Sequence, residues 1–183
     1  MKEKIEAKLL SALGDGLVSF GEFNGQIVAE VARDRIVEAC KALKEDPELS
    51  FELLSDLCGA DMLNFEDRSA RKAYLAIEHE YRPEPVSNAE RFVVVYQLTS
   101  LKNKVRIRLK TRVDGDNPVC PSITSVFKSA NWYEREAYDM FGINFEGHPD
   151  MRRMYMPEEY EYYPLRKDFP LMGVPGSIPL PRK

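Results

Sequence analysis

A β-hairpin signal in the middle of the sequence constrains the fold most. The stretch RFVVVYQLTSL, residues 91–101, is rich in β-branched and aromatic side chains. After a tight connection at Lys102 and Asn103, the stretch KVRIRLKTRV alternates strictly between cationic and mostly apolar side chains. Because successive side chains of a strand point to opposite faces, this alternation predicts a sheet with one buried face. The sequence therefore predicts an antiparallel hairpin over residues 91–113.

A second hairpin and two helices are predicted before the central hairpin. The segments LVSFGEF and QIVAEV flank Asn24-Gly25, a dipeptide that readily adopts the positive φ angles of a type I′ turn. Apolar residues at helical spacing predict one short helix that ends at Gly14 and another over residues 34–44. Together these elements predict an α+β fold, in which helices pack on a mainly antiparallel sheet of hairpins.

Other segments complete the predicted globular domain, which spans residues 1–148. A helix is predicted over residues 50–59, because apolar residues recur every three positions between a capping serine and a glycine. A short helical turn is expected over residues 122–127. The polar stretch over residues 66–90 has no assignable regular structure and is interpreted as a probable insertion.

The run ANWYEREAYDMFG predicts one more helix, over residues 132–141. Asn131 is the predicted N-cap, and Glu134 is expected to reach back to the N–H group of that cap. Gly142 supplies the left-handed conformation that commonly ends a helix.

Charged side chains on this predicted helix allow a catalytic interpretation. Arg135 and Asp139 are four residues apart and are expected to form an ion pair. Glu136 falls on the apolar side, where an ionised carboxylate needs a buried partner. An acid-base enzyme would use such a carboxylate, with His148 as proton carrier. No nucleophile, metal-ligand set or phosphate loop accompanies them, so a helix locked by buried ion pairs that presents the next loop to a partner is favoured.

Composition and motifs weigh against several other classes of protein. The net charge of −4 gives no overall attraction to nucleic acid, although a basic row at positions 106, 108, 110 and 112 leaves a nucleic-acid module as an alternative. Three scattered cysteines suit a reducing cytosol and no disulfide framework. No dinucleotide or P-loop motif is present, and no apolar run approaches the roughly 18 residues of a membrane span. We therefore expect membrane contact to be indirect.

The sequence changes character after His148. Seven of the twelve prolines fall in the last 35 residues. Proline lacks a backbone N–H and disfavours helix and sheet interiors, so residues 149–183 are predicted to form an extended strap. The strap has too few apolar side chains to offset the entropy of ordering its backbone, which predicts that it docks on another protein.

Several short motifs resemble those of the 30 kDa subunit family of respiratory complex I, whose bacterial members are lettered C. The resemblance is dense from about residue 92 to residue 171 and looser before that. The probable insertion at 66–90 departs from the pattern, and the chain resembles the free form of this subunit more than the form fused to the quinone-site subunit. The matching motifs are ERE at 134–136, DMF at 139–141, His148, Arg152, Met154, Tyr155 and YPLRKDFPL at 163–171.

The resemblance implies a peripheral-arm subunit of NADH:quinone oxidoreductase that has no catalytic residues of its own. It implies no cofactor in this chain, with FMN and iron-sulfur clusters in other subunits. It also implies packing chiefly on the quinone-site subunit, lettered D in the family, with the peripheral-arm subunits lettered B, I and G as further neighbours. The expected location is the cytoplasmic side of a bacterial or archaeal membrane, reached only through the complex. An equivalent subunit of a ferredoxin- or F420H2-dependent complex is the alternative.

The family pattern also suggests which residues serve structure and subunit contact. By position these are Trp132, Glu134, Arg135, Glu136, Asp139, Phe141, Gly142, His148, Arg152, Arg153, Pro164, Arg166, Lys167, Asp168 and Phe169.

Overall fold

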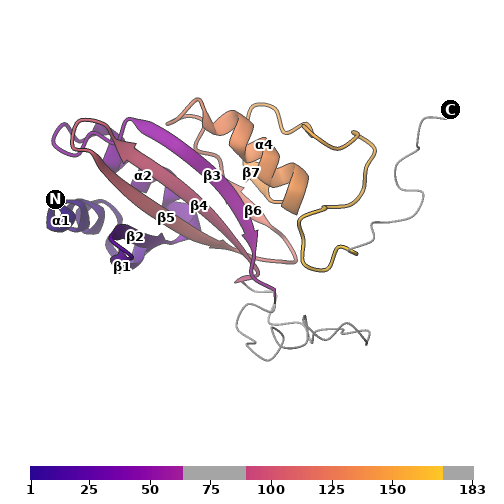
Figure 1. Cartoon of the computed structure of the whole chain (residues 1–183), viewed down its shortest axis with the longest axis horizontal. Coiled ribbons are helices and arrows are strands. Elements are labelled where there is room, and N and C mark those ends of the chain that lie inside the picture. The colour runs from indigo at the N-terminus through magenta and orange to yellow at the C-terminus, as the bar shows by residue number, and fades with distance from the viewer. Residues whose placement is uncertain (64–89, 171–183) are drawn as a thin grey trace.

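A computed structural model of the chain describes residues 1–63 and 90–170 (Figure 1). The predicted insertion at 66–90, apart from its last residue, and the end of the predicted strap at 171–183 lie outside the described residues. Within the described ranges the helices and strands are α1 (Lys2–Leu13), β1 (Leu17–Phe23), β2 (Gln26–Val31), α2 (Ile36–Glu45), β3 (Leu53–Asp61), β4 (Phe92–Ser100), β5 (Val105–Val113), β6 (Val119–Pro121), α4 (Ala130–Phe141) and β7 (Asn144–Glu146), with short 3-10 helices at Gly14–Gly16 and Arg33–Arg35.

Five strands form one sheet in the order β1-β2-β5-β4-β3. Three of the four neighbouring pairs are antiparallel, whereas β2 and β5 run parallel, with Ile27 opposite Ile107. The short strands β6 and β7 form a separate parallel pair. The predicted α+β class with a mainly antiparallel sheet is therefore confirmed.

Both predicted hairpins are present. Asn24 and Gly25 have φ angles of 49° and 75°, as the predicted turn between β1 and β2 requires. Strands β4 and β5 pair along their whole length, from Phe92 opposite Val113 to Ser100 opposite Val105. The central hairpin thus lies inside the sheet, between β2 and β3.

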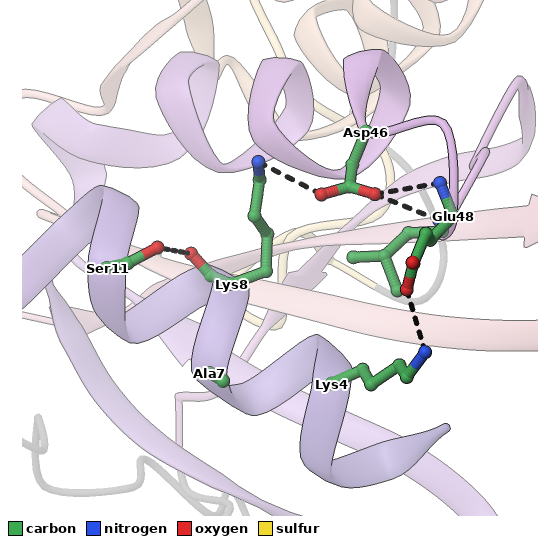
Figure 2. Close-up of a pocket in the computed structure, with 7 residues that line it drawn as sticks. Lys4, Ala7, Lys8, Ser11, Asp46 and Glu48 are labelled. Atoms are coloured by element: carbon green, nitrogen blue, oxygen red, sulfur yellow. Dashed lines mark hydrogen bonds and ion pairs between the residues drawn. The ribbon is translucent and has the colours of Figure 1, made fainter.

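Helix α1 lies against the loop that follows α2 (Figure 2). Lys4 Nζ lies 2.7 Å from the Glu48 carboxylate, and Lys8 Nζ lies 3.0 Å from that of Asp46. These two ion pairs border a pocket of about 340 Å³ beside Ser11. Both lysines already have carboxylate partners near solvent, so each pair contributes little to stability and the pocket does not form an anion site.

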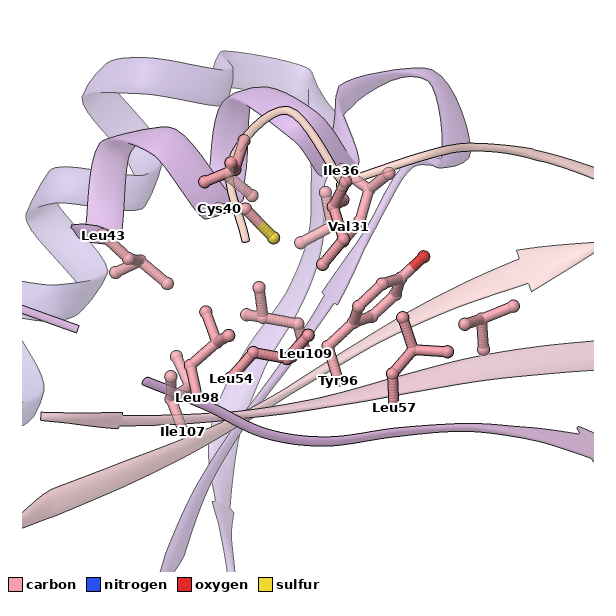
Figure 3. Close-up of a cluster of buried hydrophobic side chains, with 14 of the residues drawn as sticks. Val31, Ile36, Cys40, Leu43, Leu54, Leu57, Tyr96, Leu98, Ile107 and Leu109 are labelled. Carbon is pink, nitrogen blue, oxygen red and sulfur yellow. The ribbon is translucent and has the colours of Figure 1, made fainter. Parts of the chain in front are cut away.

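The main core lies between the sheet and helices α1 and α2 (Figure 3). Cys40 of α2 faces Tyr96 and Leu98 of β4, and Ile107 and Leu109 of β5 complete the layer below it. All five residues have side chains that are essentially inaccessible to solvent. The alternation in β5 therefore buries one row of side chains as predicted.

The prediction of a helix over residues 50–59 is wrong, because residues 53–61 form strand β3. The pairing of β3 with β4 shifts register between Leu54 and Asp56, which marks a β-bulge. The extra residue lets Leu54 and Leu57 point into the same core although they are three positions apart. This odd spacing imitates a helical period in the sequence. The helical turn expected over residues 122–127 is present as a single turn, in which the N–H groups of Val126 and Phe127 donate to the Ile123 carbonyl at 2.9 and 2.8 Å.

Helix α4 packs against edge strand β3 (Figure 1). The close approach depends on Gly59 of β3. A Cβ atom on Gly59 would lie 2.7 Å from Phe141 Cδ2 and 3.2 Å from Ile143 Cδ1, which are closer than ordinary van der Waals contacts. The absence of a side chain at this position therefore sets the distance between α4 and the sheet.

We expect Gly59→Ala to lower the free energy of unfolding by about 1 to 3 kcal/mol, because the added methyl group overpacks the contact with Phe141. Gly21→Ala is the matched control, since a Cβ there meets no atom within 4 Å. The control should change stability by less than about 0.5 kcal/mol in urea denaturation. Equal effects of the two substitutions would contradict this account of the packing.

Candidate protein-docking site

The first turn of α4 differs from the prediction. The helix begins at Ala130, with Ser129 as N-cap and no side-chain capping bond. The predicted cap at Asn131 and the predicted capping role of Glu134 are therefore wrong. Glu134 instead points into the protein and is fully buried, on the same face of the helix as Ala130 and Ala137.

The buried Glu134 carboxylate fastens α4 to the loop after β6. The Ser122 hydroxyl donates to Oε2 at 2.7 Å, and the Ile123 backbone N–H donates to Oε1 at 2.7 Å. Ser122 Oγ also lies 2.7 Å from Thr124 Oγ1. Burial raises the pKa of Glu134 to about 7, although the bonds from Ser122 and Ile123 favour the ionised form.

His148 completes this cluster from the other side. Its side chain is fully buried, with Nε2 4.0 Å from Glu134 Oε2. The Asp150 backbone N–H donates to Nδ1 at 2.9 Å, so the ring hydrogen sits on Nε2, which lies 3.1 Å from the Asn131 carbonyl oxygen. His148 therefore holds the start of the following segment against α4.

A second buried carboxylate, Asp139, holds the segment that follows. Its Oδ2 accepts three successive backbone N–H groups, from Met154 at 3.0 Å, Tyr155 at 2.7 Å and Met156 at 3.1 Å. Its Oδ1 accepts a bond from Arg153 Nη1 at 2.8 Å. Asp139 itself is fully buried. Burial opposes ionisation of Asp139, but these donors outweigh it and lower its pKa below the usual value.

Two arginines form further bonds between α4 and the segment that follows His148. The nearly buried Arg153 also donates to the Tyr162 carbonyl at 3.3 Å, and its guanidinium carbon lies 5.0 Å from the centre of the Tyr163 ring. Arg135 donates to the carbonyl groups of Arg152 at 2.9 Å and Arg153 at 3.2 Å. The predicted pair between Arg135 and Asp139 is therefore wrong, because Arg153 takes the carboxylate.

A third cluster ties the end of the described segment to the sheet. Arg91 forms a bidentate pair with Asp61, with N–O distances of 3.0 and 2.6 Å, and binds Asp168 at 3.0 Å. The Lys167 N–H donates to Asp61 Oδ2 at 2.8 Å. Burial opposes ionisation of Asp61, but Arg91 and the backbone donors lower its pKa. Residues 61 and 91, which no sequence motif singled out, thus anchor residues 167 and 168.

Arg166 links this end of the segment to the end of α4. Its Nε donates to the Phe141 carbonyl at 2.6 Å, and its guanidinium carbon lies 4.4 Å from the centre of the Tyr163 ring. Gly142 has the predicted left-handed φ of 75°. A Cβ on it would lie 2.5 Å from Arg166 Nη2, so glycine is required for both the backbone angle and the contact.

The remaining residues of the family pattern are exposed or half-buried. Glu136 is exposed, so the prediction that it is buried on the apolar side is wrong; Glu134 is the buried member of the pair. Trp132 is 59% exposed, with the Arg135 guanidinium 5.0 Å from its ring centre. Arg152 pairs with Asp150 at the surface. Pro164 and Phe169 are half-buried.

Residues 149–170 thus contain neither helix nor strand, yet they are bonded to α4 and the sheet at several points. We call these residues the anchored segment. The sequence predicts that this part of the strap docks on another protein, whereas the structure shows it bonded to α4 and to Asp61 of its own chain. The outer side of the segment carries exposed large apolar side chains, namely Tyr155, Tyr162 and Leu165.

Within residues 1–63 and 90–170, no three His, Cys, Asp or Glu side chains are grouped so that they could hold a metal ion. No helix in the same part of the chain is long and apolar enough to cross a membrane.

Comparison with known proteins decides the family. A family model described as the 30 Kd subunit of respiratory-chain NADH dehydrogenase matches residues 29–175. The chain belongs to this family. The NADH-quinone oxidoreductase subunit lettered C 2 in Rhizobium etli is 44% identical over 172 residues, which cover 94% of this chain and 79% of that protein. The subunit lettered C in Coxiella burnetii is 41% identical, and the match covers 90% of this chain and 78% of that protein.

One solved structure agrees with this assignment, and a second shares the fold. The trypsin-resistant fragment (1-134) of Nqo5 aligns with a TM-score of 0.56 at 31% identity, covering 80% of this chain and 98% of the fragment. A chain of the membrane-bound sulfane sulfur reductase, an archaeal respiratory membrane complex, aligns with a TM-score of 0.67. That match covers 93% of this chain and 86% of the other, and at 21% identity it shows a shared fold alone. With the family established, the protein is a peripheral-arm subunit of a complex I-type oxidoreductase.

The pKa of Glu134 predicts how stability depends on pH. The folded-state pKa of about 7 lies above the ordinary value of 4.5, so the folded state binds more protons between these values. The free energy of unfolding should therefore fall by about 3 kcal/mol as pH rises from about 4.5 to above 7. Glu134→Gln should remove this fall, because the amide stays neutral at every pH.

Glu136→Gln, a change at an exposed neighbour, is the control and should keep the wild-type profile. Urea denaturation at about pH 5 and about pH 8 measures the difference. Parallel profiles for wild type and Glu134→Gln would count against a buried, titrating Glu134.

Asp139→Asn should release the anchored segment. The substitution leaves Arg153 without its counter-charge and points amide hydrogens at backbone donors, which costs about 3 to 5 kcal/mol. Trypsin should then cleave after Arg152 and Arg153 much faster than in the wild type. Asp150→Asn removes only a surface pair and should leave the wild-type cleavage rate nearly unchanged. If both variants resist trypsin equally, Asp139 is not the anchor.

Proposed function

We propose that the chain is a non-catalytic scaffold that packs on the quinone-site subunit of the complex through the outer side of the anchored segment. In this proposal the complex transfers electrons from NADH to quinone with coupled ion translocation, and this chain binds no flavin, iron-sulfur cluster or quinone. Its location is the cytoplasmic side of the membrane, as a peripheral part of the complex.

The inward-facing charges of α4 and the anchored segment carry the proposal. Three charged groups of the family pattern form internal bonds, because Glu134, Asp139 and Arg153 face inward with donors or acceptors at hydrogen-bond distance. A substrate in solvent has no access to the two carboxylates, since both are fully buried. The same bonds leave large apolar side chains on the outside of the segment.

This arrangement suits a protein interface better than an active site. Aromatic side chains are enriched in protein interfaces, and a segment held from behind loses little conformational entropy when it docks. The acid-base alternative requires Glu136 and His148 to act together. The structure instead places Glu136 in solvent and buries His148 beside Glu134.

The proposal is tested with the purified quinone-site subunit and the full-length chain. We expect a stable complex, and we expect Tyr155→Asp together with Leu165→Asp to weaken it by more than about 10-fold, because charges replace apolar contacts in the interface. The control pair, Val18→Asp with Phe23→Asp, changes similarly exposed residues of β1 and should retain binding. Binding is measured by titration calorimetry.

The isolated chain should also contain no iron by elemental analysis and show no flavin absorbance. Stoichiometric iron or flavin in the isolated chain, or failure to bind the quinone-site subunit, would contradict the proposed function.

A further inference from the structure

The Glu134 carboxylate ends a short chain of hydroxyl groups that the proposed function does not use. Thr124 Oγ1 lies 2.7 Å from Ser122 Oγ, and Ser122 Oγ lies 2.7 Å from Glu134 Oε2. Glu134 and Ser122 are buried, whereas Thr124 is half-buried. The chain of hydrogen bonds therefore runs from a partly accessible residue to a carboxylate that solvent does not reach directly.

The hydrogen bonds of this chain can reverse their direction. When Glu134 is ionised, the Ser122 hydroxyl donates to Oε2 and the Thr124 hydroxyl donates to Ser122 Oγ. When Glu134 carries a proton, its own O–H donates to Ser122 Oγ, and the Ser122 hydroxyl donates to Thr124 Oγ1. The Thr124 N–H donates to Ser122 Oγ at 3.2 Å in both states. Ser122 thus makes the same number of hydrogen bonds whether or not Glu134 is protonated, so neither state leaves its buried hydroxyl unpaired.

The surroundings of Glu134 do not fix its charge. The titratable side chains that interact with it within the described residues are Cys40 of α2, Tyr96 of β4, Cys120 of β6 and His148. Burial raises the pKa of both thiols and of the phenol well above neutrality, so these three groups stay uncharged. In the same part of the chain no lysine or arginine pairs with this carboxylate, which therefore has no permanent counter-charge.

His148 borders the carboxylate but does not extend the chain of hydroxyl groups. Its Nδ1 accepts the Asp150 N–H at 2.9 Å, which places the ring hydrogen on Nε2. This Nε2 lies 3.1 Å from the Asn131 carbonyl oxygen and 4.0 Å from Glu134 Oε2. A nitrogen that already carries a hydrogen cannot accept a proton from Glu134. A proton that enters through the hydroxyl groups therefore stops at Glu134.

From this geometry we propose that Glu134 is a proton-binding site and that the Thr124 and Ser122 hydroxyl groups form the path by which protons reach it from solvent. In one uptake step a hydronium ion gives a proton to Thr124 Oγ1, the Thr124 hydrogen moves to Ser122 Oγ, and the Ser122 hydrogen moves to Glu134 Oε2. One O–H bond breaks in the hydronium ion, one forms on Glu134, and each hydroxyl group keeps one hydrogen. Both steps within the protein span 2.7 Å, which is within reach for proton transfer.

Time-resolved infrared spectroscopy of the isolated full-length chain measures this proton uptake. A laser flash releases protons from a caged acid and lowers the pH from about 8 to about 6, a range in which ordinary carboxyl groups stay ionised. The carboxylic acid C=O stretch that is missing from Glu134→Gln reports on Glu134. Thr124→Val removes the outer hydroxyl group but leaves the Ser122 bond to the carboxylate in place.

We expect Glu134 to take up its proton at least about 10-fold more slowly in Thr124→Val, because the proton must then wait for local opening of the structure. Thr124→Ser, which keeps a hydroxyl group, should retain the wild-type rate. Thr111→Val is the matched control and should also retain it, since the buried Thr111 hydroxyl has no hydrogen-bond partner in the part of the chain that the structure describes.

Ser122→Ala gives a second readout at equilibrium. The Ser122 hydroxyl donates to the ionised carboxylate, so its loss should raise the pKa of Glu134 and move the infrared titration midpoint to higher pH. Urea denaturation verifies that each variant is folded, and Thr124→Ala replaces Thr124→Val if the latter does not fold.

Two results would overturn the inference. Proton uptake at the wild-type rate in a folded variant that lacks the Thr124 hydroxyl would show that this path is wrong. Absence of a Glu134 band at about pH 6 in the wild type would show that Glu134 does not bind a proton there. Neither result bears on the proposed docking to the quinone-site subunit, which uses a different part of the chain.

Discussion

The buried carboxylate of Asp139 is the interaction on which the functional part of the structure depends. A single side chain of α4 accepts three consecutive backbone N–H groups and an arginine from a segment that has no helix or strand of its own. Backbone groups buried without secondary structure must find partners, and here one ionised oxygen satisfies three of them. The proline-rich anchored segment is thereby held in one conformation, although it has no helix or strand hydrogen bonds of its own.

Two further buried carboxylates lie near the two ends of the anchored segment. Glu134 lies beside His148 where the segment begins, and Asp61 binds Arg91 and the Lys167 N–H where its described part ends. The two sites respond differently to protons. Among residues 1–63 and 90–170, Glu134 has no close arginine and its pKa is raised, whereas Asp61 has Arg91 beside it and its pKa is lowered. Loss of the Asp61 contribution is therefore expected only in acid below the ordinary aspartate range, well away from the window in which Glu134 titrates.

The central hairpin, the Asn24-Gly25 turn and the class of the fold could be predicted from the sequence, because alternation and turn chemistry are local signals. Strand β3 could not, since a bulge places Leu54 and Leu57 in the core at a spacing that imitates a helix. Because β3 is not predicted, the sequence does not indicate a role for Asp61 either. Asp61 lies at the end of β3, where it pairs with Arg91.

The sequence predicts which residues belong to the candidate site, but it does not predict which of them bond to each other. Arg135 and Asp139 have ideal helical spacing, yet Asp139 binds Arg153 because the returning segment supplies stronger, buried donors. The sequence pattern predicts Glu134 at the cap of the helix and Glu136 on the apolar side, whereas the structure buries Glu134 and exposes Glu136. The helical spacing of Glu134 from the small residues Ala130 and Ala137 was the available signal for a buried face. Long-range contacts of this kind are absent from any single window of sequence.

The most direct test of this account is amide hydrogen exchange of Met154, Tyr155 and Met156 in the isolated full-length chain. If Asp139 binds these three groups without help from a partner, their exchange should be slowed to a degree similar to amides within α4. Exchange at the rate of an unfolded peptide, with α4 still protected, would show that the segment is not anchored by its own chain and would contradict the account.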